Sequence, residues 1–170
     1  MSGPAWFRLK VRHYEVDGYG HVNHATYVHY LETARLEALE ELGMSLEEMR
    51  HQGYRIVATE LAVRFHAPAR SGDILEIETH IREFQGARSI WTQEIRHAGS
   101  QRLLVSAEVT GAFTTKVGRP VRIPPAFRQK LMTLFLPAES APGERNRMRA
   151  GQEKGVGTRK GGGGHGAENS

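Results

Sequence analysis

Asp17 is the side chain best placed for chemistry, because it stands in a glycine-bracketed turn ahead of a long amphipathic helix. The helix begins near His24, seven residues after the carboxylate. Free backbone N–H groups and the positive end of the helix dipole attract a developing oxyanion at such a helix start. A base or nucleophile that faces an oxyanion site is the minimum requirement for acyl transfer. An ordinary turn followed by a capped helix has the same spacing, so spacing alone leaves both interpretations open.

The helix that would supply those N–H groups is predicted over residues 24–42, with apolar side chains at three- and four-residue spacings. These are Tyr27, Val28, Leu31, Ala34, Ala38, Leu39 and Leu42. Asn23 is expected to cap the N-terminus, because its side-chain oxygen can accept from a free N–H of the first turn. Gly43 marks the C-terminal end. A further helical turn is expected over 45–51, where a serine and a glutamate stand at capping-box spacing.

The other periodic segments alternate between apolar and polar residues, which is typical of half-buried strands. They cover residues 6–14, 57–66, 75–82, 91–96 and 103–115. Short turns, such as the one over 68–73, favour antiparallel neighbours. Pro124 and Pro125 predict a short last helix that reaches about residue 135. The expected fold class is α+β, with an antiparallel sheet of about five strands wrapped around one long helix. Edge strands in so small a sheet favour a homodimer with a continuous sheet.

Length and composition limit the classes of protein. The 170 residues suit one domain, expected over 1–137, followed by a glycine-rich and charged segment over 138–170 that is predicted to be a disordered tail. The chain contains no cysteine, which excludes disulfides, thiolate metal sites and a cysteine nucleophile. No apolar run is long enough for a signal peptide or a membrane span, so we expect a soluble cytoplasmic protein without a membrane partner.

The formal net charge of +4 is shared equally between the expected domain and the expected tail. Residues 138–170 hold 6 Lys or Arg against 4 Asp or Glu, and the remaining residues hold 17 against 15. No basic helix or stripe alternates with aromatic residues, so nucleic acid is not an expected partner.

Two segments resemble a known family. Asp-Gly-Tyr-Gly-His-Val-Asn-His-Ala-Thr-Tyr at 17–27 and Phe-His-Ala-Pro-Ala-Arg-Ser-Gly-Asp at 65–73 resemble the hot-dog-fold acyl-CoA thioesterases of the 4-hydroxybenzoyl-CoA thioesterase family. The resemblance covers residues 6 to about 135. It implies hydrolysis of an acyl-CoA to a free acid and coenzyme A, with no cofactor and no metal. It also implies a homodimer or homotetramer with a site shared between two subunits.

The resemblance assigns a role to each matching residue. Asp17 matches the catalytic aspartate, which acts as a general base or a nucleophile. His24 matches the position whose backbone N–H polarises the thioester carbonyl. Six further residues are expected to contact the substrate: His21, Asn23, Tyr27, Arg70, Arg88 and Ser89. The turn before Arg88 would lie near the phosphates of coenzyme A, which suit an arginine, although solvated turn arginines are an equally good interpretation. Tyr27 suits either the acyl pocket or plain core.

Several alternatives stay open. A non-catalytic hot-dog module could bind acyl-CoA, but a pure binder has no need of Asp17. The His-Val-Asn at 21–23 also looks like acyl-carrier-protein thioesterases, where a polar amide stands at the position of Tyr19; the tyrosine favours acyl-CoA. Glu32 is an alternative base, although an i,i+3 contact with Arg35 explains it as well. The spacing of the histidines near the helix start does not favour zinc, and no Gly-x-Ser-x-Gly elbow exists.

Overall fold

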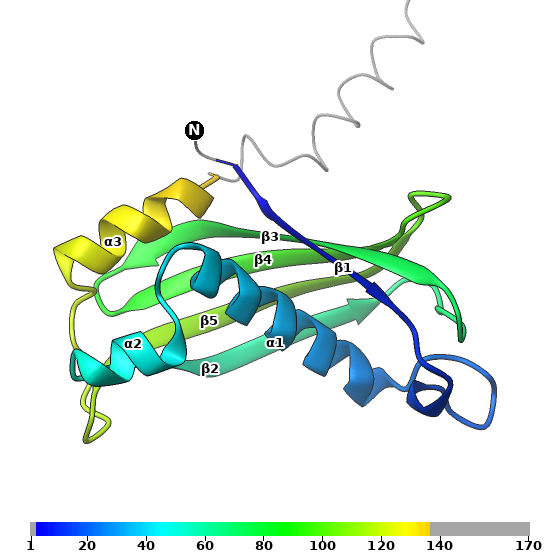
Figure 1. The fold of residues 1–170 in the computed structure, drawn as a ribbon, viewed down its shortest axis with the longest axis horizontal. Helices are drawn as coiled ribbons and strands as arrows, with labels where there is room; N and C mark the ends of the chain where they lie inside the picture. Colours follow the sequence, from blue (N-terminus) through cyan, green and yellow to red (C-terminus); the bar gives the residue numbers. More distant parts are fainter. Residues whose placement is uncertain (1–2, 137–170) are drawn as a thin grey trace, which may run out of the picture. The chain divides into compact units, whose positions relative to one another are not determined.

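A five-stranded antiparallel sheet is the main element of the computed structural model, which describes residues 3–136 of one compact unit. The strands lie in the order β1-β3-β4-β5-β2. Their bounds are Ala5–Lys10 for β1, Tyr54–Phe65 for β2, Ile74–Gln85 for β3, Arg88–His97 for β4 and Leu103–Thr115 for β5. The sheet curves around one long helix, α1, which lies across one of its faces (Figure 1). The predicted α+β hot-dog architecture is therefore confirmed.

Helix α1 spans His24–Glu41 and presents one apolar side to the sheet. Its buried residues are Tyr27, Tyr30, Leu31, Ala34, Ala38 and Leu39. The predicted cap is confirmed, because Asn23 Oδ1 accepts the N–H of Ala25 at 2.9 Å. Gly43 follows the helix with φ +64°, a conformation that glycine adopts without strain.

Two shorter helices complete the described part. Helix α2 spans Leu46–His51, and its predicted cap is present because Ser45 Oγ accepts the N–H of Glu48 at 3.1 Å. Helix α3 spans Pro125–Leu131, and a 3-10 turn over Met132–Leu134 continues it, which matches the expected last helix.

The prediction of a first strand over 6–14 is too long at its C-terminal end. Strand β1 ends at Lys10, and His13–Glu15 form a 3-10 turn. The reason is local, because the Glu15 carboxylate accepts the backbone N–H of Arg12 at 2.7 Å and closes the chain on itself. This turn leads the chain from the sheet edge to the Asp17 turn.

A polar bridge joins α1 to the middle of the sheet. Gln93 on β4 is fully buried, and its Nε2 donates to the carbonyl of Leu31 and to Thr79 Oγ1, each at 2.9 Å. Its Oε1 accepts from Arg35 Nη1 at 2.6 Å. Arg35 therefore bonds to the sheet, and the predicted contact with Glu32 is not among the ion pairs within the described residues. Every polar atom of the Gln93 amide thus has a partner at the helix–sheet interface.

Strand β2 forms one edge of the sheet and exposes large apolar side chains. Val57, Leu61 and Phe65 are 41%, 44% and 53% exposed. The register against β5 shifts between Ala58 and Glu60, which marks a bulge that alternation alone does not predict. An apolar edge strand of this length is a surface that proteins normally cover.

The residues over 3–136 contain no helix that is both long and apolar enough to cross a membrane. The predicted tail over 138–170, and the boundary at 137, lie outside the described residues.

Candidate active site

An open pocket of about 410 Å³ lies between the Asp17 turn, the first turn of α1 and the end of β2. It is lined by Asp17, His21, Val22, His24, Tyr27, Phe65, His66, Ala67 and Pro68. Four of the predicted site residues are in this set, so the structure brings together the carboxylate, both neighbouring histidines and Tyr27.

The turn itself orients the Asp17 carboxylate. Its Oδ1 accepts the backbone N–H groups of Tyr19 at 2.8 Å and of His21 at 3.2 Å. The backbone closes the same turn, because Gly20 N–H donates to the Asp17 carbonyl at 3.0 Å. Gly20 has φ +76°, which explains a glycine at this position. Oδ2 is left without a hydrogen bond to the described residues, so one carboxylate oxygen is anchored and the other is available.

The start of α1 provides the matching donor. Asn23 uses its side-chain oxygen for Ala25 N–H and its carbonyl for Thr26 N–H, each at 2.9 Å. The N–H of His24 has no hydrogen-bond partner within residues 3–136. It lies at the start of the helix, where the helix dipole is positive. Asn23 therefore acts as the cap, and the structure gives its side chain this role rather than a place in the pocket lining.

Tyr27 lies under the pocket and is almost completely buried. Its hydroxyl accepts the backbone N–H of Ala69 at 2.9 Å, and its ring contacts the Phe65 ring with centroids 5.8 Å apart. Burial raises the pKa of the Tyr27 hydroxyl, so this group is neutral. The structure thus gives Tyr27 a hydrogen-bonded position as well as a share of the pocket wall.

The predicted arginines take different places. Arg70 is exposed in the turn after β2, and its backbone forms a bridge with His21 of the Asp17 turn. Arg88 is exposed at the start of β4, where it pairs with Ala112. Phe65 of the pocket pairs with Val105 at the other end of β5, so Arg88 lies at the opposite end of the sheet within one chain.

Ser89 is fully buried beside Arg88. Its Oγ accepts the indole N–H of Trp91 at 2.9 Å. Within one chain, neither Arg88 nor Ser89 meets the pocket that holds Asp17.

Sequence reasoning does not assign five residues of the pocket wall to the site: Val22, Phe65, His66, Ala67 and Pro68. His66 is the most polar of them, with Nε2 and Ser106 Oγ 2.8 Å apart. The sequence of residues 65–73 predicts a turn, but which of its residues face Asp17 depends on how the segment folds back onto the Asp17 turn. Spacing carries no signal for that contact.

Glu32 lies elsewhere. It lines a separate, smaller cavity of about 120 Å³ together with Arg35, Leu36 and Trp91, among others. Asp17 is absent from the lining of that cavity. The arrangement therefore favours Asp17 over Glu32 as the base beside the helix start. Nowhere in the described part of the chain do three or more His, Asp or Glu side chains gather as a metal site would require.

Several known proteins of similar sequence are named as thioesterases or thioester hydrolases. This chain is 34% identical over 124 residues to the acyl-acyl carrier protein thioesterase ATL3 of Arabidopsis thaliana, which covers 73% of this chain and 65% of that protein. It is 38% identical over 105 residues to the acyl-CoA thioester hydrolase YbgC of Escherichia coli O157:H7, with coverage of 61% and 78%. The chain thus spans slightly less than two thirds of the length of its Arabidopsis relative.

Solved structures show the same fold. The Thermus thermophilus protein TT1821 is 30% identical, with a TM-score of 0.70 over 76% of this chain and 98% of that chain. A 1,4-dihydroxy-2-naphthoyl-CoA thioesterase from Synechocystis is 21% identical with a TM-score of 0.71, over 76% and 96%, which supports the fold alone. The sequence pattern of the family described as the thioesterase-like superfamily matches residues 11–131. With this match over most of its length, the chain belongs to the thioesterase-like superfamily of hot-dog proteins.

Proposed function

We propose that this protein is an acyl-CoA thioesterase that hydrolyses a thioester to a free acid and coenzyme A. The observation that supports it most is one pocket that joins an anchored Asp17 carboxylate to the free N–H of His24 at a helix start. The YbgC relative carries the same activity in its name.

In the proposed reaction, the N–H of His24 donates to the thioester carbonyl oxygen. Asp17 removes a proton from water as the water oxygen bonds to the carbonyl carbon, and the resulting oxyanion is stabilised at the helix start. Collapse of the tetrahedral intermediate breaks the C–S bond, and the proton held by Asp17 neutralises the thiolate. Direct attack by the carboxylate, followed by hydrolysis of the anhydride, uses the same two groups.

The proposal also includes the substrate contacts and the assembly. His21 and Tyr27 would border the acyl group, Asn23 would hold the helix start, and Arg70 would reach the pocket rim. A second copy that pairs antiparallel along β2 would cover the exposed apolar edge and bring its own Arg88 end toward Asp17. Arg88 could then meet the phosphates of coenzyme A, with Ser89 supporting that turn. A tetramer would be built from two such dimers.

Free-thiol release from a panel of aromatic, short-chain and long-chain acyl-CoAs tests the proposal, with Asp17→Asn alongside the wild type. The substitution is nearly isosteric and keeps the Oδ1 acceptor for the turn. We expect turnover to fall by at least ~10²-fold while the fold survives, because the base is lost. Glu37→Gln, which neutralises an exposed carboxylate on α1, is the matched control and should retain wild-type turnover.

Unchanged turnover in Asp17→Asn would remove Asp17 from the proposal. Binding of acyl-CoA without release of thiol would instead favour a non-catalytic hot-dog module. The expected cytoplasmic location belongs to the same proposal and is tested by cell fractionation.

A carrier-protein thioesterase is the second candidate, because the Arabidopsis relative is named for that activity. One acyl group presented on coenzyme A and on acyl carrier protein separates the two candidates. We expect the larger kcat/KM with coenzyme A. A preference for the carrier protein would reverse the assignment of substrate class.

A further inference from the structure

The backbone of Ala69 contacts both halves of the proposed site. Its carbonyl accepts the N–H of Val22 at 2.9 Å, and its own N–H donates to the Tyr27 hydroxyl at 2.9 Å. Val22 follows the Asp17 turn, whereas Tyr27 belongs to the first turn of α1. Ala69, Val22 and Tyr27 are all buried, so water does not readily replace either bond.

The turn that contains Ala69 also holds the Asp17 turn directly. The backbone of Arg70 forms an antiparallel bridge with His21, one residue before the Val22 bond. His21 N–H is in turn one of the two donors to the Asp17 carboxylate. A shift of the Ala69 turn therefore moves the Asp17 carboxylate.

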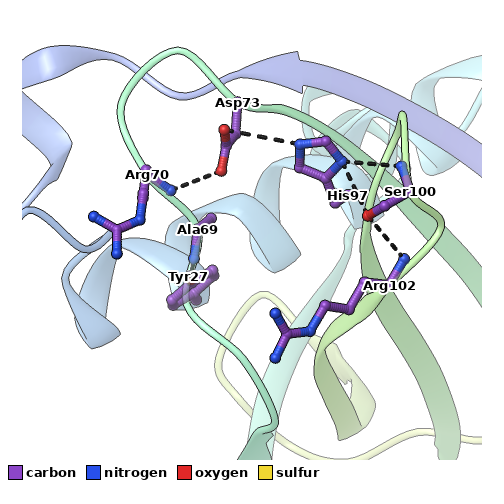
Figure 2. A network of polar contacts seen from close by, with 7 residues as sticks. All are labelled: Tyr27, Ala69, Arg70, Asp73, His97, Ser100 and Arg102. Carbon is purple, nitrogen blue, oxygen red and sulfur yellow. Dashed lines mark hydrogen bonds and ion pairs between the residues drawn. The ribbon is translucent and has the colours of Figure 1, made fainter.

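A second carboxylate, that of Asp73, contacts both this turn and His97, as Figure 2 shows. Asp73 Oδ2 accepts the backbone N–H of Arg70 at 2.8 Å, and Oδ1 lies 3.8 Å from His97 Nε2 on β4. His97 Nδ1 accepts the backbone N–H of Ser100 at 3.2 Å, so Nε2 carries a ring proton and faces Asp73. The Arg70 guanidinium points away from Asp73 in the same view, so Asp73 contacts the backbone of Arg70 and not its side chain.

We propose that Tyr27 and Asp73 are positioning residues for thioester hydrolysis, acting through the backbone of Ala69 and Arg70 to set the separation between the Asp17 carboxylate and the His24 N–H. The inference rests on the proposed function. Neither side chain needs to touch the reacting atoms. A displacement of about 1 Å between a base and an oxyanion donor can cost ~10²-fold in rate. Hydrogen bonds that fix their separation therefore affect kcat.

Tyr27→Phe is the most selective variant, because it deletes one hydroxyl and retains the ring that packs on Phe65 and Tyr30. The N–H of Ala69 then loses its acceptor. We expect kcat for acyl-CoA hydrolysis to fall roughly 10- to 100-fold with KM within about twofold of the wild type. Amide hydrogen exchange of Ala69 and Val22 should become faster in the variant.

Two controls separate positioning from general stability. Tyr54→Phe removes a hydroxyl from a ring that packs on Phe127 at the other end of the sheet. Ile123→Val truncates a buried side chain at that same end and lowers the melting temperature without approaching the Asp17 pocket of its own chain. Both variants should retain the wild-type kcat.

Asp73 provides a test by rescue. Asp73→Ala removes the acceptor for Arg70 N–H and should lower kcat about tenfold, whereas Asp73→Asn keeps a carbonyl acceptor and should restore most of it.

The outcomes separate the two proposals. If wild-type protein releases thiol, Asp17→Asn does not, and Tyr27→Phe has the wild-type kcat, positioning is overturned and the proposed function stands. A rise in KM with unchanged kcat would place the hydroxyl on the substrate and overturn positioning as well. An equal loss of kcat in Tyr27→Phe and Ile123→Val would show that the loss comes from lower stability of the fold, and it would overturn positioning. No release of thiol by the wild type from any thioester would overturn both proposals.

Discussion

The Glu15 carboxylate joins three segments around the proposed site. It accepts the backbone N–H of Arg12 at 2.7 Å and the hydroxyl of Tyr30 at 2.6 Å, while its backbone carbonyl accepts the N–H of Asn23 at 3.0 Å. Burial by itself raises the pKa of Glu15, but the hydrogen bonds from Tyr30 and Arg12 outweigh it, and the pKa lies below its ordinary value of 4.5. The folded protein therefore prefers the ionised form.

Acid unfolding should report this residue. A carboxyl whose pKa is lowered by folding adds stability above its unfolded pKa, near 4.5, and loses it as the pH falls through the folded pKa. We expect Glu15→Gln to cost roughly 1–2 kcal/mol at neutral pH and to show a smaller further loss below pH ~4.5 than the wild type. Urea unfolding at a series of pH values measures both. Parallel curves for the two proteins would contradict a lowered pKa at Glu15.

At the scale of elements, the start of α1 is a capped terminus that also borders the proposed site. Asn23 caps Ala25 N–H and leaves the N–H of His24 without a partner within residues 3–136. Substitution of the cap should therefore loosen the first turn of the helix before it affects the rest of the fold.

Asn23→Ala should cost about 1 kcal/mol of stability and lower kcat, because the first turn frays. Asn23→Asp retains a capping oxygen and should recover the stability and most of the activity. Thermal unfolding and steady-state kinetics provide the comparison. If Asn23→Asp keeps its stability but its KM rises several-fold, the Asn23 side chain contacts the substrate and is more than a cap.

Elements governed by local chemistry were predictable from the sequence. The extent of α1 follows from its hydrophobic spacing, and its two ends follow from Asn23 and Gly43. The start of α2 follows from the serine that caps it. The end of β1 is the exception among local features, because the alternation of apolar and polar residues continues past Lys10 and gives no sign of the hydrogen bond from Arg12 N–H to the Glu15 carboxylate. The bulge in β2 and the contact of His66 with the pocket arise from pairing with distant strands, for which spacing gives no signal.

At the scale of the whole molecule, the apolar edge of β2 is the feature that one chain leaves incomplete. Val57, Leu61 and Phe65 are exposed on it, and Phe65 also lines the proposed pocket. A second copy on this edge would bury the patch and complete the wall of the pocket, which links assembly to activity.

Leu61→Lys should therefore weaken the assembly and the activity together, because a charge on the paired edge disfavours edge-to-edge contact. We expect a dimer or tetramer for the wild type and a larger monomer fraction for the variant in sedimentation equilibrium, with a parallel loss of kcat. Val117→Lys places the same charge on an exposed loop and should change neither. A wild-type monomer with full activity would contradict a site shared between subunits.

The buried amide of Gln93 has a consequence for how such an enzyme could change its substrate. By donating to the Leu31 carbonyl and accepting from Arg35, it removes the freedom of α1 to slide or rotate on the sheet. A slide of one residue would carry the helix start about 1.5 Å along its axis, enough to separate His24 N–H from Asp17. On the proposed function, related enzymes that take larger or smaller acyl groups are expected to differ in the side chains of β2, while the position of α1 on the sheet stays the same.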